Sequence, residues 1–167
     1  MPVPVTRLEE LRASTFLTPC RGEDLTALAA AMEEVTFARD HLLYEQGASG
    51  DAMHLILSGQ VGVLRAVDRD LPAAVKTRPR DRILAVVGAG ECVGEMALID
   101  GEPRSATVVA VDEVVTAQLT RAGYDRLRAA DVRCGIRVTL GLFRLISRRI
   151  RQVDKSLEQV NHRMYTI

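Results

Sequence analysis

Hydrophobic residues recur at helical spacing near the start of the chain. Leu25, Leu28 and Met32 fall on one face of a helix that would begin at Gly22. Two acidic residues follow this glycine, and negative charge is favourable in the first turn of a helix. The pattern therefore predicts a helical lead-in over residues 1–34.

The hydrophobic period changes to two at Val35 and continues to Leu119, with glycine-centred turns at intervals. Such alternation is typical of short strands in a sandwich or barrel. The segment 66–82 interrupts the alternation with two prolines and eight charged residues, and we expect it to be an exposed loop between two strands. The pattern predicts a mainly β fold, an eight-stranded β-roll or jelly-roll barrel over residues 35–119, with flanking helices.

Two helices are expected in the last part of the chain, residues 120–167. Thr120 and Asp131 are residue types that cap helix N-termini, and a helical pattern follows each of them. The second helix would be long, from 131 to about 160. Gly135 and Gly141 lie in its first half, where they indicate either a hinge or close packing against the barrel.

The long helix also carries a heptad pattern, in which apolar residues are spaced alternately by three and four positions. The pattern comprises Phe143, Ile146, Ile150, Val153, Leu157, Val160, Met164 and Ile167. A helix that covers its own domain usually has a wider apolar stripe. The heptads instead favour coiled-coil pairing of two subunits through residues 143–167, although these residue types do not distinguish a dimer from a higher oligomer.

The composition of the chain argues against several classes of protein: nucleic-acid binders, membrane proteins and secreted proteins. The chain has 22 basic and 22 acidic residues, and this zero net charge argues against a general nucleic-acid binder. No apolar run approaches the ~20 residues of a membrane span, and the N-terminus lacks the features of a signal peptide. Cys20, Cys92 and Cys134 are odd in number and scattered, which indicates free thiols and a cytoplasmic location.

The sequence contains no recognisable pattern of catalytic residues. His41, His54 and His162 are scattered and match no metal-binding motif, and no nucleophile and base can be grouped by spacing. We therefore expect a protein that is not an enzyme and that holds neither a metal nor a cofactor.

The stretch 93–107 carries the strongest chemical pattern. A helical turn that begins at Glu95, directly after Gly94, would point free backbone N–H groups at an anion. Arg104 would add a planar fork of charged donors, and Ser105 would add a hydroxyl. Because a carboxylate repels phosphate, Glu95 is expected to accept hydrogen bonds from sugar hydroxyls. The combination indicates a site for a sugar phosphate or a nucleotide.

These residues resemble the phosphate-binding cassette of cyclic nucleotide-binding domains. The resemblance rests on Gly-Glu-x-Ala-Leu followed by Pro-Arg-Ser-Ala-Thr within residues 93–107, and it extends to the segments 43–47 and 53–59. It covers most of the chain, from the helical lead-in to the closing helices. The resemblance implies the cyclic nucleotide-binding fold and a cyclic nucleotide as the ligand. It leaves the purine open, because a hydroxyl such as that of Ser105 can favour cGMP through its 2-amino group, while bacterial cAMP receptors of the family also carry a serine there. Of the two ligands we favour cAMP.

The resemblance also implies a role for each cassette residue. Glu95 and the Gly94 backbone would bind the ribose 2′-OH. Arg104 would bind the cyclic phosphate, together with Ser105 and two backbone N–H groups. The full set of implied ligand contacts is Val93, Gly94, Glu95, Met96, Ala97, Leu98, Arg104, Ser105 and Ala106.

The base is expected to lie between Ala85 and Val87 on one side and the long helix, acting as a lid, on the other. Bacterial catabolite activators of this family use two adjacent hydroxyl residues on that helix to contact adenine. Here Val153 and Asp154 stand at those positions, and neither offers a hydroxyl. The remaining candidates for base contacts are Arg148, Arg149 and Asp154.

Two functions are compatible with these patterns. The first is a stand-alone, dimeric cyclic nucleotide sensor, without an attached DNA-binding or channel domain, that signals through its last helix to an unknown downstream protein. The second is a coiled-coil interaction or scaffold protein with a vestigial nucleotide pocket. A vestigial pocket is expected to lose Glu95 or Arg104, and because both are present we favour the sensor.

Overall fold

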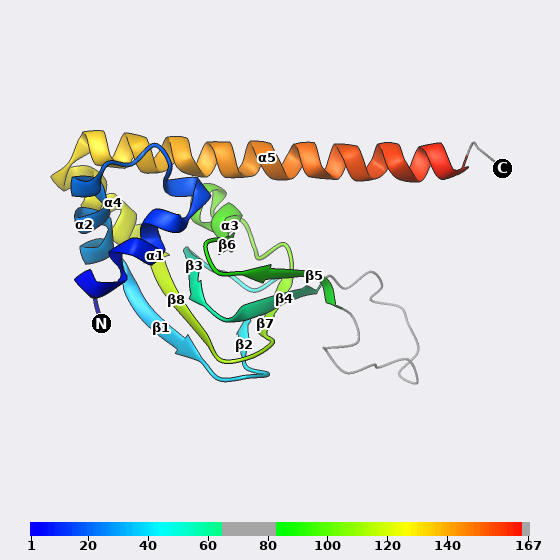
Figure 1. Cartoon of the computed structure of the whole chain (residues 1–167), viewed down its shortest axis with the longest axis horizontal. Coiled ribbons are helices and arrows are strands. Elements are labelled where there is room, and N and C mark those ends of the chain that lie inside the picture. Colours follow the sequence, from blue (N-terminus) through cyan, green and yellow to red (C-terminus); the bar gives the residue numbers. More distant parts are fainter. Residues whose placement is uncertain (65–82, 165–167) are drawn as a thin grey trace.

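The computed structural model describes residues 1–64 and 83–164, so the predicted loop at 66–82 lies outside the described residues. The strands form the body of the molecule, and the shorter helices gather on one side of it (Figure 1). Helix α5 (Val132–Met164) runs across that side and continues beyond the body. No helix in the described ranges is both long and apolar enough to cross a membrane.

Short helices form the N-terminal lead-in, as predicted. They are η1 (Val5–Arg7), α1 (Leu8–Ala13), η2 (Thr15–Leu17) and α2 (Gly22–Ala31). The backbone N–H of Arg21 donates to the Asp24 carboxylate at 2.5 Å, which fixes the start of α2. The acidic first turn recognised in the sequence therefore acts as a helix cap.

Eight strands are present in the described residues. They are β1 (Glu33–Phe37), β2 (Leu42–Tyr44), β3 (Ala52–Ser58), β4 (Gln60–Leu64), β5 (Ile83–Gly88), β6 (Cys92–Val93), β7 (Thr107–Ala110) and β8 (Val114–Thr120). They form two antiparallel four-stranded sheets with the orders β1-β8-β3-β6 and β2-β7-β4-β5. The eight strands of the predicted β-roll or jelly roll thus form two facing sheets. Among the described strands no pairing joins the two sheets, so the barrel is not closed.

Strand β3 is buried on both faces. Met53, Leu55 and Leu57 pack with the helices in one hydrophobic cluster, while Ile56 belongs to a second cluster between the two sheets. Side chains alternate across a strand, so a strand covered on both faces reads as a continuous apolar run. This central strand holds the helices and both sheets together.

The C-terminal helices begin at the two predicted caps. The Thr120 hydroxyl accepts a hydrogen bond from the backbone N–H of Gly123 at 3.0 Å, at the start of α4 (Arg121–Ala130). The Asp131 carboxylate accepts from the backbone N–H groups of Arg133 and Cys134 at 2.9 and 3.0 Å, at the start of α5. Both contacts satisfy N–H groups that a helix leaves unpaired.

Helix α5 lies against the body through contacts in its first half. A Cβ atom at Gly141 would lie 2.0 Å from the carbonyl oxygen of Phe16, so the helix backbone packs directly on η2. One turn earlier, Arg137 donates to the buried Asp24 carboxylate at 2.6 Å. The glycine at 141 therefore allows close packing, which was one of the two interpretations from the sequence, the other being a hinge. The packing partner is η2 and not the predicted barrel.

This contact generates a prediction about stability. Gly141→Ala should lower the free energy of unfolding by about 1–3 kcal/mol, because the added methyl group must displace the η2 backbone. Gly22→Ala is the matched control, since the nearest atom to its added methyl group is the Arg12 Nη2 at 3.6 Å. It should stay within about 0.5 kcal/mol of the wild type. Urea denaturation of both variants measures the difference, and equal stabilities would contradict close packing at Gly141.

Candidate functional site

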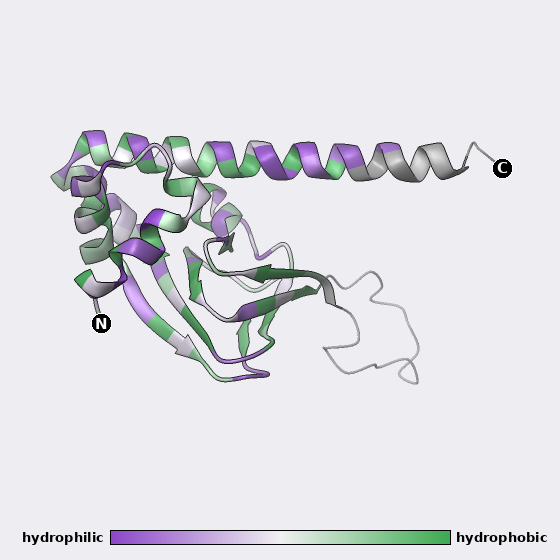
Figure 2. Ribbon diagram, in the orientation of Figure 1, coloured by the Kyte–Doolittle hydropathy of each residue, from purple (hydrophilic) through white to green (hydrophobic). Residues whose placement is uncertain are grey.

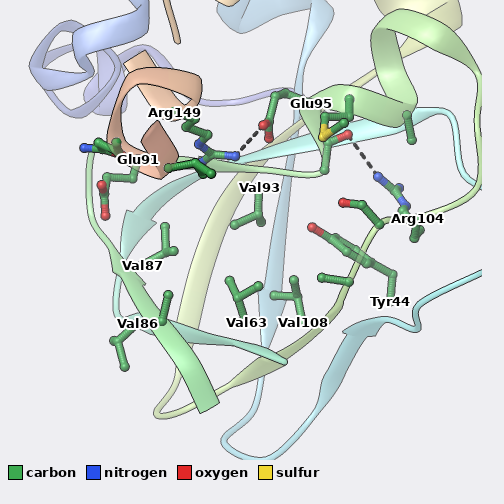
Figure 3. A pocket seen from close by; sticks show the side chains of 18 residues that line it. Tyr44, Val63, Val86, Val87, Glu91, Val93, Glu95, Arg104, Val108 and Arg149 are labelled. Carbon is green, nitrogen blue, oxygen red and sulfur yellow. Dashed lines mark hydrogen bonds and ion pairs between the residues drawn. The ribbon is translucent and has the colours of Figure 1, made fainter. Parts of the chain in front are cut away.

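A cavity of about 660 Å³ lies between the β2-β7-β4-β5 sheet, helix α3 (Glu95–Asp100) and helix α5 (Figure 3). Aliphatic side chains line one side of the cavity, and a few charged groups lie on the other (Figure 3). The lining residues are Tyr44, Val63, Ala85, Val86, Val87, Glu91, Val93, Gly94, Glu95, Met96, Ala97, Arg104, Ser105, Ala106, Val108, Arg149, Gln152 and Val153. A concave site with few polar groups in an apolar wall is typical of small-molecule binding.

The turn into α3 requires a glycine. Gly94 has φ of +78°, in the left-handed region, directly before the first helical residue. A Cβ atom here would lie 2.4 Å from Nη1 of Arg104. The absence of a side chain at Gly94 therefore lets the Arg104 guanidinium come close to the backbone of the turn.

Arg104 is buried, with 7% of its surface exposed. Its Nη1 donates to the carbonyl oxygens of Ala52 at 2.6 Å and Gly94 at 3.1 Å. The guanidinium also lies 4.2 Å from the centre of the Tyr44 ring, a cation–π contact that fixes its plane. The Nε atom is buried without a hydrogen-bond partner in the described structure. An anion in the cavity would supply the acceptors that this cation lacks.

Glu95 is the first residue of α3, and only 2% of its surface is exposed. One carboxylate oxygen accepts a hydrogen bond from Nη1 of Arg149 on α5, as Figure 3 shows. Nη2 of the same arginine donates to the carbonyl oxygen of Cys92. A buried carboxylate without a charged partner would be costly, and Arg149 supplies that partner.

A histidine lies behind the Arg104–Tyr44 pair but adds no charge to the site. His54 is buried on β3, and its ring contacts those of Phe37 and Tyr44. Burial, and then the positive charge of Arg104, lower the pKa of His54 to about 4. The imidazole is therefore neutral at physiological pH and hydrogen-bonded to the Thr116 hydroxyl at 3.1 Å.

The cavity brings together most of the residues that the sequence singled out. All of the predicted cassette residues line it except Leu98, whose side chain packs into the core. Ala85 and Val87, the candidates for the base pocket, also line the cavity, on its aliphatic side. A ligand contact at Leu98 can come only from its backbone, as the family resemblance implied.

Two predicted contacts on α5 are absent from this cavity. Arg148 and Asp154 do not line it, whereas Arg149, Gln152 and Val153 do. Successive helical residues are rotated by about 100°, so Arg149 and Asp154 point to different sides. Asp154 is exposed, and Arg148 lines a separate cavity near η2. Arg149, predicted as a base contact, is paired with Glu95.

Tyr44 and Gln152 line the cavity but were not predicted. Tyr44 lies at the end of a short strand, where an aromatic residue has no distinctive pattern. Gln152 was accessible to sequence reasoning, since it is three residues after Arg149 and therefore shares its side of the helix. Within the described ranges, no group of three or more histidine, cysteine or acidic side chains is arranged to hold a metal ion.

Comparison with known proteins agrees with this geometry. The family profile described as cyclic nucleotide-binding domain matches residues 34–131. The chain is 33% identical over 120 residues to a cAMP-dependent protein kinase regulatory subunit of Aspergillus fumigatus, covering 72% of this chain and 25% of that protein. It is 34% identical over 116 residues to the cyclic AMP receptor protein of Thermus thermophilus, covering 70% and 48%. This chain thus spans between a quarter and about half of these two relatives.

A solved structure extends the similarity beyond the matched segment. The crystal structure of a cyclic nucleotide-binding domain from Methylobacillus flagellatus superposes with a TM-score of 0.76 at 28% identity. The alignment covers 91% of this chain and 85% of that one. The similarity therefore includes residues on both sides of 34–131.

The Arg149–Glu95 ion pair predicts that substitutions of these two residues have coupled effects on stability. Arg149→Gln should lower the free energy of unfolding by about 1–3 kcal/mol, because it leaves a buried carboxylate without its charged partner. In a Glu95→Gln background the same substitution should cost much less, and a double-mutant cycle with urea denaturation measures the difference. Arg133→Gln, at an exposed position of α5, should have little effect in either background. An equal cost of Arg149→Gln in both backgrounds would rule out the coupling.

Proposed function

The chain belongs to the family of cyclic nucleotide-binding domains, and we propose that it is a sensor that binds a cyclic nucleotide, with cAMP preferred to cGMP. The observation that carries the proposal is the pair of buried charges, Arg104 and Glu95, on one cavity. A cyclic nucleotide presents a phosphate and a ribose 2′-OH close together, and these match a guanidinium and a carboxylate. The names of the relatives, which refer to cAMP, support the same ligand.

In the proposed complex, Arg104 binds the cyclic phosphate. Arg104 lines the cavity, and Ser105 with the backbone N–H groups of Ala97 and Leu98 adds further donors. Glu95 accepts a hydrogen bond from the ribose 2′-OH while Arg149 keeps its charge balanced. Val93, Met96 and Ala106 complete the wall around the sugar phosphate. The ligand then replaces missing hydrogen bonds without disrupting those present.

The base is proposed to pack between the aliphatic wall and α5. Ala85, Val87 and Val153 supply apolar surface, and Arg149 and Gln152 are the polar side chains of α5 on this cavity. Adenine gains more from an apolar environment than guanine, which carries an additional carbonyl oxygen to be satisfied. This difference favours cAMP.

Helix α5 is proposed to carry the signal. Arg149 joins this helix to the residue that receives the ribose, so ligand binding at Glu95 changes the environment of the helix contact. A ligand shifts a conformational equilibrium only if it binds the two conformations with different affinities. We propose that the Arg149–Glu95 contact is the source of this difference in affinity. The downstream protein would read the position of α5. The proposal includes neither catalysis nor a metal, and it assigns the protein to the cytoplasm.

We also propose that α5 pairs with its copy in a homodimer through residues 143–167. Phe143 and Ile150 are 68% and 58% exposed, which is high for large apolar side chains. Val153, the next heptad position, is 58% exposed and also lines the nucleotide cavity, so the proposed seam adjoins that cavity. Hydrophobic positions alternate with hydrophilic ones along the coloured part of α5 in Figure 2. The other heptad side chains, at 157, 160, 164 and 167, lie outside the described side chains. A second α5 would cover the exposed residues.

The nucleotide site is tested by calorimetric titration of cAMP. Arg104→Ala should weaken binding by about 2–4 kcal/mol, because the phosphate loses a charge-assisted partner in a buried site. Arg104→Lys should recover only part of this loss, since a lysine offers no planar fork.

Arg126→Ala is the matched control, because this arginine is exposed on α4 and distant from the cavity lining. It should bind cAMP like the wild type. Titration of cGMP in parallel tests the base preference. If the wild type bound neither nucleotide, the scaffold alternative with a vestigial pocket would replace the sensor.

The dimer is tested by substitution of the exposed heptad positions. Ile150→Asp should shift the protein to monomer in sedimentation experiments, because two carboxylates would face each other in the apolar seam. Val132→Asp is the control, since Val132 is 61% exposed on the same helix but precedes the heptads. An unchanged sedimentation coefficient for Ile150→Asp would exclude pairing along this seam.

A further inference from the structure

Three arginines of α5 lie together on a side of the helix that the nucleotide site does not use. Arg144, Arg148 and Arg151 are spaced by four and three residues, so they share one edge of the helix. With Thr15 and Thr18 they line a cavity of about 310 Å³ between α5 and the η2 region. All five residues that line this cavity carry hydrogen-bonding side chains.

The positive charge of this cluster is not balanced. None of the ion pairs and side-chain hydrogen bonds formed by the described residues involves Arg144, Arg148 or Arg151. In contrast, Arg137 and Arg149 on the same helix are each paired with a buried carboxylate. The cluster therefore concentrates three guanidinium groups without a partner of opposite charge in the described structure.

Arg148 provides a second, independent observation. Its Nη2 atom is buried and has no hydrogen-bond partner among the described residues. Besides the larger cavity, it lines an adjoining one of about 110 Å³, next to Glu91 and Cys92. A buried donor without an acceptor costs free energy, and an anion that reached this donor would recover that cost.

We propose that this cluster, Arg144, Arg148 and Arg151 with Thr15 and Thr18, is a second anion site that binds a small phosphate compound. Guanidinium groups pair with phosphate oxygens through parallel hydrogen bonds. Thr15 and Thr18 line the facing wall, where Thr15 can add a hydroxyl donor, while the Thr18 hydroxyl donates to the carbonyl oxygen of Thr15 at 2.7 Å. The wall formed by the η2 region makes the site concave, which suits a small anion better than a flat membrane or a nucleic-acid backbone. The site is separate from the cavity of Arg104, since the two cavities share no lining residue.

An anion here would bridge two elements that must stay together. Thr15 belongs to η2, on which α5 packs through Gly141, and the three arginines follow on the next turns of α5. Binding would hold α5 against η2 and stabilise the folded state by mass action. Arg148 is also adjacent in sequence to Arg149, so the same docking keeps Arg149 close to Glu95.

The proposal is tested with inorganic pyrophosphate as the probe, by calorimetric titration and by the thermal unfolding midpoint of the full chain. The wild type should bind pyrophosphate and unfold at a higher temperature in its presence. Arg148→Gln/Arg151→Gln should weaken binding at least ~10-fold, because charge-assisted hydrogen bonds are lost. Arg126→Gln/Arg133→Gln, which removes the same charge from exposed positions of α4 and α5, should bind within about twofold of the wild type.

Arg104→Gln separates the two sites. The pyrophosphate binding that Arg148→Gln/Arg151→Gln weakens should persist in Arg104→Gln, whereas loss of all binding in Arg104→Gln would show that the probe occupies only the first cavity. Equal weakening in the cluster variant and its charge-matched control would also overturn the proposal. So would binding of duplex DNA or of phosphatidylserine vesicles through the same arginines in the absence of pyrophosphate binding. Circular dichroism of each variant confirms that it is folded.

Discussion

The ion pair between Arg149 and Glu95 is the contact on which the cavity depends. A carboxylate that is 2% exposed needs a charged partner, and this partner lies 54 residues further along the chain. The pair forms only if α5 is docked on the body. Docking rests in turn on the approach of Gly141 to Phe16 and on the Arg137–Asp24 pair, both remote from the cavity. The chemistry of the site is thus set by helix packing elsewhere.

Different sides of helix α5 carry residues with different roles. Cys134, Val138, Leu142 and Leu145 are buried against the body. Phe143 and Ile150 are largely exposed and belong to the proposed dimer seam, while Arg144, Arg148 and Arg151 form the proposed anion site. Because about 100° separates successive residues, one helix can present these sets on different sides. The proposed dimer seam, the proposed anion site and the proposed nucleotide site therefore all include residues of this helix.

Local features were predictable from the sequence because their causes are local. Thr120 and Asp131 cap helices through hydrogen bonds to N–H groups within three residues. The chemistry of the cassette is visible in a short segment, since at most ten positions separate Gly94, Glu95 and Arg104. The donors and acceptors of these residue types indicate which ligand groups they can bind. Non-local features were harder to predict. The pairing of eight strands into two sheets, and not one closed barrel, depends on contacts between distant segments.

The sequence by itself determined the strand and helix content, the caps and the cassette that defines the family, because spacing and residue chemistry are sufficient for each. Tertiary structure alone decided which side of α5 meets the cavity. Arg148, Arg149 and Asp154 are equivalent candidates by residue type, and only the docking angle places Arg149 on Glu95 and Arg148 near η2. The same is true of Tyr44, whose stacking on Arg104 follows from the way β2 faces the cassette. A one-dimensional pattern does not encode such an angle, because it results from all the packing contacts together.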